Sequence, residues 1–207
     1  HLPYGNKSPE AVIRFAKQNA RFLLTQNIKL LIIPCHTACC HALSILQEQL
    51  PIPVMGVIQP GLDLVKSVER IAILGTVSTI ESQLYQSMIK HQNPQATIYA
   101  TACPLFVPLI EEGLYNHSSM ALMAKTYLSP LLGKVDAVLL ACTHYPLARQ
   151  ALSHILGPQI ALLEPAEKCA LQVQDYLAKT QSLNPQTKKP TYSFYVSDDP
   201  GKFQKLW

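Results

Sequence analysis

Long apolar runs are missing from this sequence, and so is any concentration of positive charge. No apolar stretch approaches the roughly 18 residues that a membrane-spanning helix needs. Only 14% of the 207 residues are charged, and 17 basic against 13 acidic residues give a net charge of +4. The basic residues are scattered, and their densest pair, Lys188 and Lys189, lies in a polar linker. The sequence therefore predicts no membrane insertion and no direct nucleic-acid binding.

Several short motifs are absent as well. The six cysteines include no Cys-x-x-Cys pair, which disfavours thiol–disulfide exchange. Most of them follow apolar runs or lie in helix-like segments, unlike the cysteines of a small secreted protein, so we expect a cytoplasmic, reducing environment. Gly75-Thr76 follows a predicted strand and could cradle an anion. It lacks the glycine patterns of dinucleotide sites and P-loops, so we expect no nucleotide cofactor.

What the sequence does contain is a regular alternation of strand-like and helix-like patterns. Ser8-Pro9-Glu10 is typical of a helix start, with a capping serine, a proline and an acid in the first turn. The patterns predict helices over 8–23, 37–48, 79–90, 106–112, 119–131, 147–155 and 166–178. They predict strands over 29–34, 53–58, 70–76, 96–101, 136–142, 159–163 and 192–196, with a loop over 180–190. Such alternation predicts an α/β fold of parallel sheets with helices on both faces.

Two units of this alternation resemble each other and lie about half a chain apart. Each is an apolar run that ends in a cysteine, Cys35 in the first unit and Cys142 in the second. Gln59-Pro60-Gly61 interrupts the pattern between them and is a candidate crossing between lobes. We expect two similar lobes with a cleft between them. The first would comprise residues 1–58 with 170–207, and the second residues 59–169.

The position of these two cysteines suggests acid–base chemistry. Ligands of open α/β sheets bind at the carboxyl ends of the strands. A cysteine there, before a helix N-terminus, is expected to have a lowered pKa, and the same backbone N–H groups can bind a carboxylate. With one sulfur on each face of a carbon atom, one thiolate could remove a proton while the opposite thiol supplies one. That is racemisation by two bases, and it needs no cofactor.

Other interpretations of the same residues stay open. A cysteine after an apolar run is most often a packing residue. Zinc is another candidate, because the following residues are crowded together: Cys35, His36, Cys39, Cys40 and His41. Their spacing completes no tetrahedral set, so we expect no metal. Glu111 follows an apolar run, and its simplest interpretation is a solvated helix end.

The order of several motifs along the chain resembles that of bacterial glutamate racemases. These motifs are Pro3-Tyr4-Gly5, Cys35-His36-Thr37-Ala38, Pro53-Val54-Met55-Gly56-Val57, Gly75-Thr76, Ala102-Cys103-Pro104-Leu105 with Glu111, and Cys142-Thr143-His144-Tyr145-Pro146-Leu147. The tail, Val196-Ser197-Asp198-Asp199-Pro200 with Phe203, is similar to the family's last strand and turn. The resemblance covers essentially the whole chain.

The resemblance implies cofactor-independent interconversion of L- and D-glutamate, the D form being used for peptidoglycan. It also implies two lobes related by pseudo-twofold symmetry, with the small-molecule substrate between them. Cys35 would be the base on one face and Cys142 the base on the other, with His144 and Glu111 assisting Cys142. The implied substrate-binding residues are Tyr4, Gly5, His36, Thr37, Thr76, Thr79 and Thr143. A homodimer stays an open option, and some members of the family also bind DNA gyrase.

The chain departs from the family's pattern in three places. The family's leading strand and its Asp-Ser turn are absent before Pro3, so we expect a truncated or short-encoded chain with a gap or edge in its first sheet. His36 stands where the family has asparagine, and it is larger and can be charged. Ala141 replaces a usual glycine and Cys39 a common serine, and we expect little effect from either.

Two rival functions follow from these departures. The first is an aspartate or hydantoin racemase of the same superfamily, which rates on the three substrates would separate. The second is a non-catalytic homologue that binds glutamate without exchanging its α-proton. The Pro-Tyr-Gly and Cys-Thr-His-Tyr-Pro motifs favour glutamate racemisation.

Overall fold

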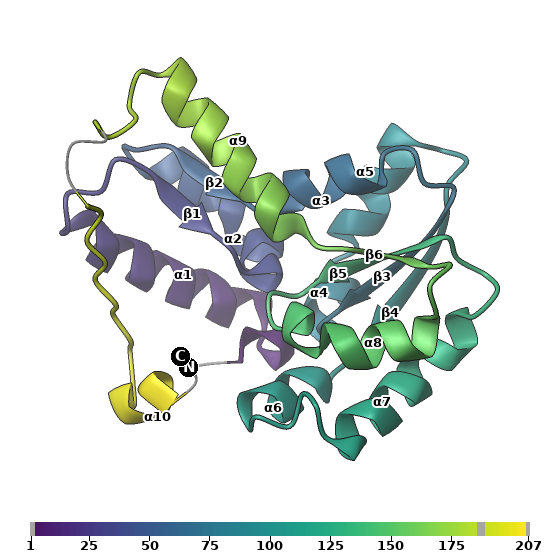
Figure 1. The fold of residues 1–207 in the computed structure, drawn as a ribbon. Coiled ribbons are helices and arrows are strands. Elements are labelled where there is room, and N and C mark those ends of the chain that lie inside the picture. The colour runs from purple at the N-terminus through teal and green to yellow at the C-terminus, as the bar shows by residue number, and fades with distance from the viewer. Residues whose placement is uncertain (1–2, 186–188, 206–207) are drawn as a thin grey trace.

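The computed structural model of the protein describes residues 3–185 and 189–205. Residues 186–188 of the expected loop, Lys188 among them, lie outside this description. Helices and strands alternate along the chain, as the sequence predicts (Figure 1). The strands are β1 (Leu31–Ile33), β2 (Val54–Gly56), β3 (Arg70–Gly75), β4 (Thr97–Ala102), β5 (Ala137–Ala141) and β6 (Ala161–Leu163).

The helices connect these strands and cover their faces. They are α1 (Pro9–Leu24), α2 (His36–Gln49), α3 (Ile58–Val65), α4 (Val77–Glu81), α5 (Leu84–Gln92), α6 (Phe106–Glu111), α7 (Ser118–Leu128), α8 (Arg149–Leu156), α9 (Pro165–Lys179) and α10 (Pro200–Lys205). Short 3₁₀ helices are η1 (Tyr4–Asn6), η2 (Ser129–Leu131) and η3 (Tyr145–Ala148). Within the described residues, no helix is long and apolar enough to cross a membrane.

The described strands form two parallel sheets. One pairs β1 with β2, and the other has the order β4-β3-β5-β6. In the larger sheet β3 lies between β4 and β5, with Gly75 opposite both Ala102 and Ala141 at the carboxyl end. The predicted α/β architecture of parallel sheets is therefore confirmed. Figure 1 shows the β1–β2 sheet with α1 and α2 on one side of the molecule and the larger sheet on the other.

The first helix begins as its sequence predicts. Ser8 is the N-cap of α1, and its hydroxyl oxygen accepts a hydrogen bond from the Ala11 amide at 3.3 Å. Pro9 is the first helical residue, where a missing N–H group costs no hydrogen bond. The helix buries Val12, Ala16 and Ala20 against the rest of the core. This anchors the chain that leads from η1 to the first sheet.

The core consists of two apolar clusters separated by the larger sheet. The second cluster joins Leu74 and Leu140 to α6, α7 and α8 on one face. The first cluster contains the other face of the same sheet, including Ile73 and Leu139, together with α1, α2, α3 and α5. The β1–β2 sheet and the inner face of the larger sheet thus share one apolar core.

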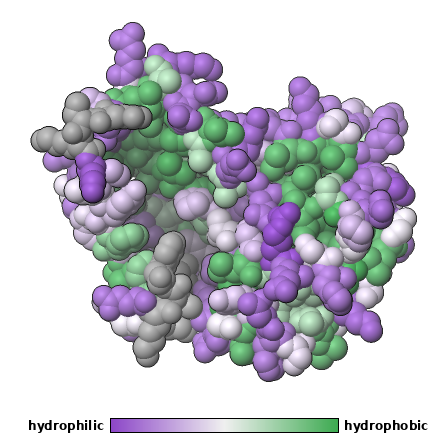
Figure 2. Space-filling model, in the orientation of Figure 1, coloured by the Kyte–Doolittle hydropathy of each residue, from purple (hydrophilic) through white to green (hydrophobic). Residues whose placement is uncertain are grey.

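The middle of β1 is exposed, unlike the central strand of the larger sheet. All of β5 is buried, whereas Ile32 in the middle of β1 is 42% exposed. Figure 2 shows apolar surface beside α9 and over the β1–β2 sheet. Leu171 of α9 is also exposed on the surface.

Two local features differ in form from the sequence pattern. Gln59-Pro60-Gly61, the candidate crossing, lies in the first turn of α3, where proline is tolerated because the first N–H groups lack helical partners. The chain does pass from one sheet to the other through this helix. The helix expected over 79–90 is interrupted, because Gln83 adopts a left-handed conformation with φ of 58° between α4 and α5.

The strand expected over 192–196 is absent from the described structure. The segment is exposed throughout and pairs with no described strand. It runs beside the first lobe toward α10 (Figure 1), and Tyr195 contacts α1 through Phe22, with ring centroids 5.0 Å apart. An alternating aromatic pattern predicts a strand only where a neighbouring strand supplies the hydrogen bonds.

Candidate active site

Cys35 lies where the sequence places it, directly after β1. It is the N-cap of α2, and its sulfur accepts a hydrogen bond from the Ala38 amide at 3.5 Å. The side chain is only partly exposed. This geometry holds the thiol at the carboxyl end of the first sheet and at the positive end of a helix.

Cys142 occupies the equivalent place after β5. It is 6% exposed, and hydrogen bonds from the backbone N–H groups of His144 and Tyr145 reach its sulfur. Burial is the main cause of the raised pKa of Cys142, and the thiol of Cys35 adds to it, so the two thiols lie near enough to interact electrostatically. The structure therefore brings the two predicted cysteines to one region.

A chain of side chains leads away from Cys142. Its sulfur lies 3.9 Å from Nδ1 of His144, and Nε2 of His144 lies 3.2 Å from Oε1 of Glu111. Glu111 is the last residue of α6, and its side chain is 22% exposed. It is therefore not a solvated helix end, because its carboxylate faces the histidine beside the second cysteine.

The expected lowering of the cysteine pKa values is wrong. Burial raises the pKa of Cys35, and it raises the pKa of Cys142 to about 12. Backbone N–H groups act in the opposite direction at both sulfurs, but the loss of hydration is the larger effect. Burial therefore favours the neutral thiol at both positions, and either cysteine must lose its proton before it can act as a base.

Three threonine hydroxyls lie between the two sheets. Oγ1 of Thr37 is 2.9 Å from Oγ1 of Thr76 and 3.0 Å from Oγ1 of Thr79. The Thr76 hydroxyl lies 3.0 Å from that of Thr79 and also accepts from the Thr79 amide as the N-cap of α4. All three are buried. This hydroxyl triangle joins the start of α2 to the start of α4.

Tyr4 and Gly5 approach the hydroxyl triangle from η1. A Cβ atom on Gly5 would lie 2.5 Å from the Cβ of Thr76, so only glycine fits there. The Tyr4 hydroxyl accepts a hydrogen bond from the side chain of Asn19 at 3.2 Å. Burial raises the pKa of Tyr4, and the nearby thiol of Cys35 adds to this shift. These two predicted residues therefore lie with the first cysteine and the threonines.

His36 does not carry the charge that its residue type allows. It is 3% exposed, and its Nδ1 lies 2.9 Å from the hydroxyl of Tyr85. Burial lowers the pKa of His36 to about 3, so the ring is neutral at neutral pH. The contact with Tyr85 was not predicted, because no local pattern relates residues that are 49 positions apart.

The last predicted site residue is Thr143. It and the crowded cysteine and histidine side chains near Cys35 have different surroundings. Thr143 follows Cys142 but is exposed. Cys39 donates to the Ile33 carbonyl at 3.2 Å, and Nε2 of His41 lies 2.8 Å from the Ser78 hydroxyl. No group of three or more metal-ligating side chains occurs in residues 3–185 and 189–205. The side chains that suggested zinc thus face separate partners.

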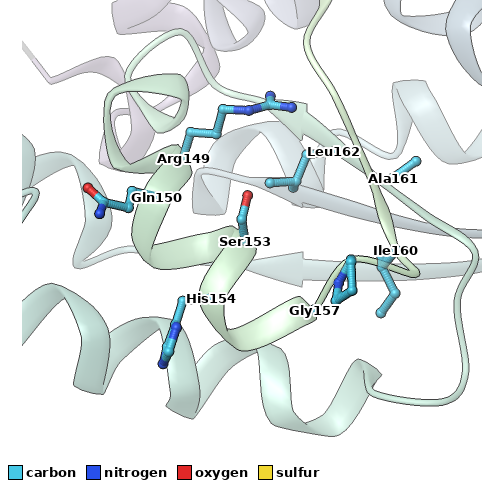
Figure 3. A pocket seen from close by; sticks show the side chains of 9 residues that line it. Arg149, Gln150, Ser153, His154, Gly157, Ile160, Ala161 and Leu162 are labelled. Carbon is cyan, nitrogen blue, oxygen red and sulfur yellow. The ribbon is translucent and has the colours of Figure 1, made fainter.

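Two surface cavities occur among the described residues. One, of about 580 Å³, is formed by α8 and β6, as Figure 3 shows, and includes Arg149 and His154. Arg149 is ion-paired with Glu164. Another, of about 450 Å³, lies between η1, α2 and α4 and includes His41 and Ser78. Neither cavity is lined by Cys35 or Cys142.

Comparison with known proteins identifies the family to which the chain is similar. The model of the Asp/Glu/Hydantoin racemase family matches residues 3–172. A glutamate racemase of Geobacter metallireducens is 41% identical over 209 aligned residues, which cover 99% of this chain and 77% of that protein. A glutamate racemase of Syntrophus aciditrophicus is 38% identical with the same coverage.

Solved structures agree with the sequence comparison. A glutamate racemase of Francisella tularensis, in complex with D-glutamate, superposes with a TM-score of 0.93 at 38% identity, covering 100% of this chain and 78% of that one. The glutamate racemase of Thermus thermophilus, in complex with β-chloro-D-alanine, gives 0.88 at 37% identity, with 100% and 77% covered. The chain therefore belongs to the Asp/Glu/Hydantoin racemase family, among its glutamate racemases.

Proposed function

We propose that this protein is a cofactor-independent isomerase that interconverts L- and D-glutamate. The observation that carries the proposal is the pair of cysteines, each at the carboxyl end of a parallel strand in a different sheet, near enough to influence each other. Glutamate as the small-molecule substrate is supported by the names of relatives at 41% and 38% identity. The D-glutamate would supply peptidoglycan synthesis in the cytoplasm.

Two thiols on opposite faces of Cα give a balanced reaction. In one direction Cys35, after releasing its own proton to solvent, removes the α-proton as a thiolate, and the thiol of Cys142 donates its proton to the opposite face. In the other direction the two sulfurs exchange roles. Each turnover therefore breaks one Cα–H bond and forms another, with no net oxidation.

Because the pKa of Cys142 is raised, its deprotonation needs help from neighbouring side chains. In this proposal His144 accepts the Cys142 proton when that thiol must act as the base. Glu111, 3.2 Å from Nε2 of His144, orients the ring and stabilises its protonated form. Among the described residues, Cys35 has no neighbouring pair of a histidine and a carboxylate like His144 and Glu111. Its thiolate is stabilised instead by the backbone amides of Thr37 and Ala38.

The substrate would bind between the two sheets. Hydroxyl and N–H groups at helix starts suit carboxylates, and they are supplied here by Thr37, Thr76 and Thr79. Tyr4, Gly5, His36 and Thr143 complete the proposed set. The lobe boundaries, residues 1–58 with 170–207 and residues 59–169, remain part of this proposal, as does a homodimer.

The proposal is tested by α-proton exchange of L- and D-glutamate in deuterated water. We expect deuterium in both enantiomers with the unaltered chain and a loss of at least about 100-fold in Cys35→Ala and Cys142→Ala, since each thiol is an acid–base group. Cys169→Ala is the matched control, because this cysteine is buried in α9. Binding of glutamate without exchange would favour the non-catalytic homologue, and faster exchange of aspartate would favour the rival racemase.

A further inference from the structure

A buried polar pair at the edge of the proposed site, which includes His36 itself, has no role in the acid–base steps. It consists of His36, 3% exposed, and Tyr85, which is fully buried. Nδ1 of the histidine lies 2.9 Å from the tyrosine hydroxyl. Burying two polar groups is costly unless they bond to each other, so this contact fixes both side chains.

The pair connects elements that belong to different sheets. His36 begins α2, which follows β1, whereas Tyr85 lies in the first turn of α5, which packs beside the larger sheet. The Tyr85 hydroxyl also donates to the Val57 carbonyl at 3.4 Å. Both bonds are satisfied when His36 carries its proton on Nδ1 and donates it to the tyrosine oxygen, while the tyrosine O–H donates to the Val57 carbonyl.

Tyr85 is itself held in place by its surroundings. A Cβ atom on Gly61 would lie 2.8 Å from the Tyr85 hydroxyl oxygen and 3.1 Å from a ring carbon. The phenol therefore lies against the backbone of α3 and has no room to move toward it. Because Tyr85 is fixed in place, its hydrogen bond also fixes the position of the His36 ring.

His36 is adjacent to the first thiol. Cys35 is the N-cap of α2 and His36 is the first helical residue. The next residue, Thr37, bonds through its hydroxyl to Thr76 and Thr79. Two consecutive side chains after the cysteine are thus attached to elements of the other sheet, and the place of the sulfur depends on both.

We propose that Tyr85 is a positioning residue that holds His36, and through it Cys35, at the correct place relative to the second lobe. This inference rests on the proposed function. Small displacements of a reacting group cost large factors in rate, so loss of the Tyr85 hydroxyl slows proton transfer at Cys35. His36 then contributes to the site mainly through its bond to Tyr85.

The test is Tyr85→Phe in the full chain, assayed with glutamate in both directions. We expect kcat to fall about tenfold while KM changes less than about twofold, because proton transfer and not binding is affected. The primary isotope effect with Cα-deuterated glutamate should increase, and more for the enantiomer whose Cα–D bond faces Cys35. Partial unfolding would lower kcat without changing the isotope effect, so this measurement separates the two causes.

Two further variants sharpen the test. In a His36→Asn background, Tyr85→Phe should change kcat less than about twofold, because the bond is already gone. Gly61→Ala presses on the Tyr85 hydroxyl from α3, where alanine favours the helix, and should reproduce the defect even if Tyr85→Phe folds poorly. Ile89→Val, one turn further along α5, is the control for a small loss of packing and should leave kcat and the isotope effect unchanged.

The outcomes are distinguishable. Normal kcat and isotope effects in both Tyr85→Phe and Gly61→Ala, or equal losses with and without His36, would overturn the positioning role while leaving racemisation intact. Absence of glutamate exchange in the unaltered chain would instead overturn the proposed function, and this inference with it.

Discussion

At the scale of single residues, the loss of hydration on burial affects the cysteine pKa values more than the N–H groups at the helix starts do. Cys35 and Cys142 both receive backbone N–H groups, yet burial raises the pKa of each. The same effect acts in the opposite direction on His36, because burial disfavours whichever form is charged. A strand-end cysteine is visible in a sequence, but the burial that decides its protonation state is not.

The neutral state of His36 makes stability depend on pH. Its pKa is lowered to about 3 in the fold, against about 6.5 in an unfolded chain. Between these values the unfolded chain binds more protons, so this residue's contribution to stability is full above about pH 6.5 and is lost as the pH falls. We expect His36→Asn to reduce the slope of the unfolding free energy against pH by up to about 1.4 kcal/mol per unit between pH 4 and 6.

Denaturant titrations of both chains at several pH values measure this slope. His91→Asn is the matched control, since His91 is exposed. Equal slopes for the unaltered chain and His36→Asn would mean that the buried ring is protonated without cost.

Whether a site residue could be predicted depends on how far its contacting partner lies from it in the sequence. The two cysteines are evident from their strands, and the family resemblance adds Glu111 and His144, which are 33 positions apart. Tyr85 and Ser78 were missed, because contacts between elements of different sheets leave no local signal. Histidine at position 36 was noticed as a departure, but its partner could be found only in three dimensions.

At the scale of elements, hydrophobic patterns predict where helices and strands occur better than how they end. Ser82 and Gln83 interrupt a predicted helix, since the Ser82 hydroxyl donates to the Thr79 carbonyl and accepts from the Leu84 amide. The pattern around 192–196 lacks a neighbouring strand among the described residues. Both errors come from bonds that the apolar pattern does not encode.

The left-handed residue between α4 and α5 offers a test at this scale. Gln83→Gly should stabilise the protein by about 0.5 kcal/mol, because the left-handed cost of roughly 1–2 kcal/mol for a side chain disappears while glycine adds entropy to the unfolded chain. The change is measured as the midpoint of thermal unfolding. Ser87→Gly, in the interior of α5, should instead destabilise by about 0.5 kcal/mol. A lower midpoint for Gln83→Gly would show that its side chain stabilises the helix start.

At the scale of the whole molecule, the two sheets are not independent. The first apolar cluster includes Leu46 from α2 and Leu139 from the larger sheet. Damage on one side of this core should therefore reach the other. The α/β class was evident from the sequence, whereas this continuity was not, because a pattern of apolar residues does not say which faces meet.

Amide hydrogen exchange tests the coupling. Leu46→Ala removes a side chain that is 2% exposed and should cost about 2–5 kcal/mol. We expect faster exchange in β5 as well as in α2, because both open with the shared core. Leu122→Ala, at a site that is 60% exposed, is the control. Faster exchange confined to α1, α2 and β1 would mean that each side unfolds alone.

The shared core also limits how this protein can be recombined with its relatives. A chimera that takes the β1–β2 half from another member of the family inherits side chains shaped to a different partner surface. The inner face of the larger sheet, with Ile71, Ile73 and Leu139, would have to be exchanged together with that half. A functional chimera would therefore have to exchange the packed interface between the two sheets as a whole, because neither lobe can be exchanged alone.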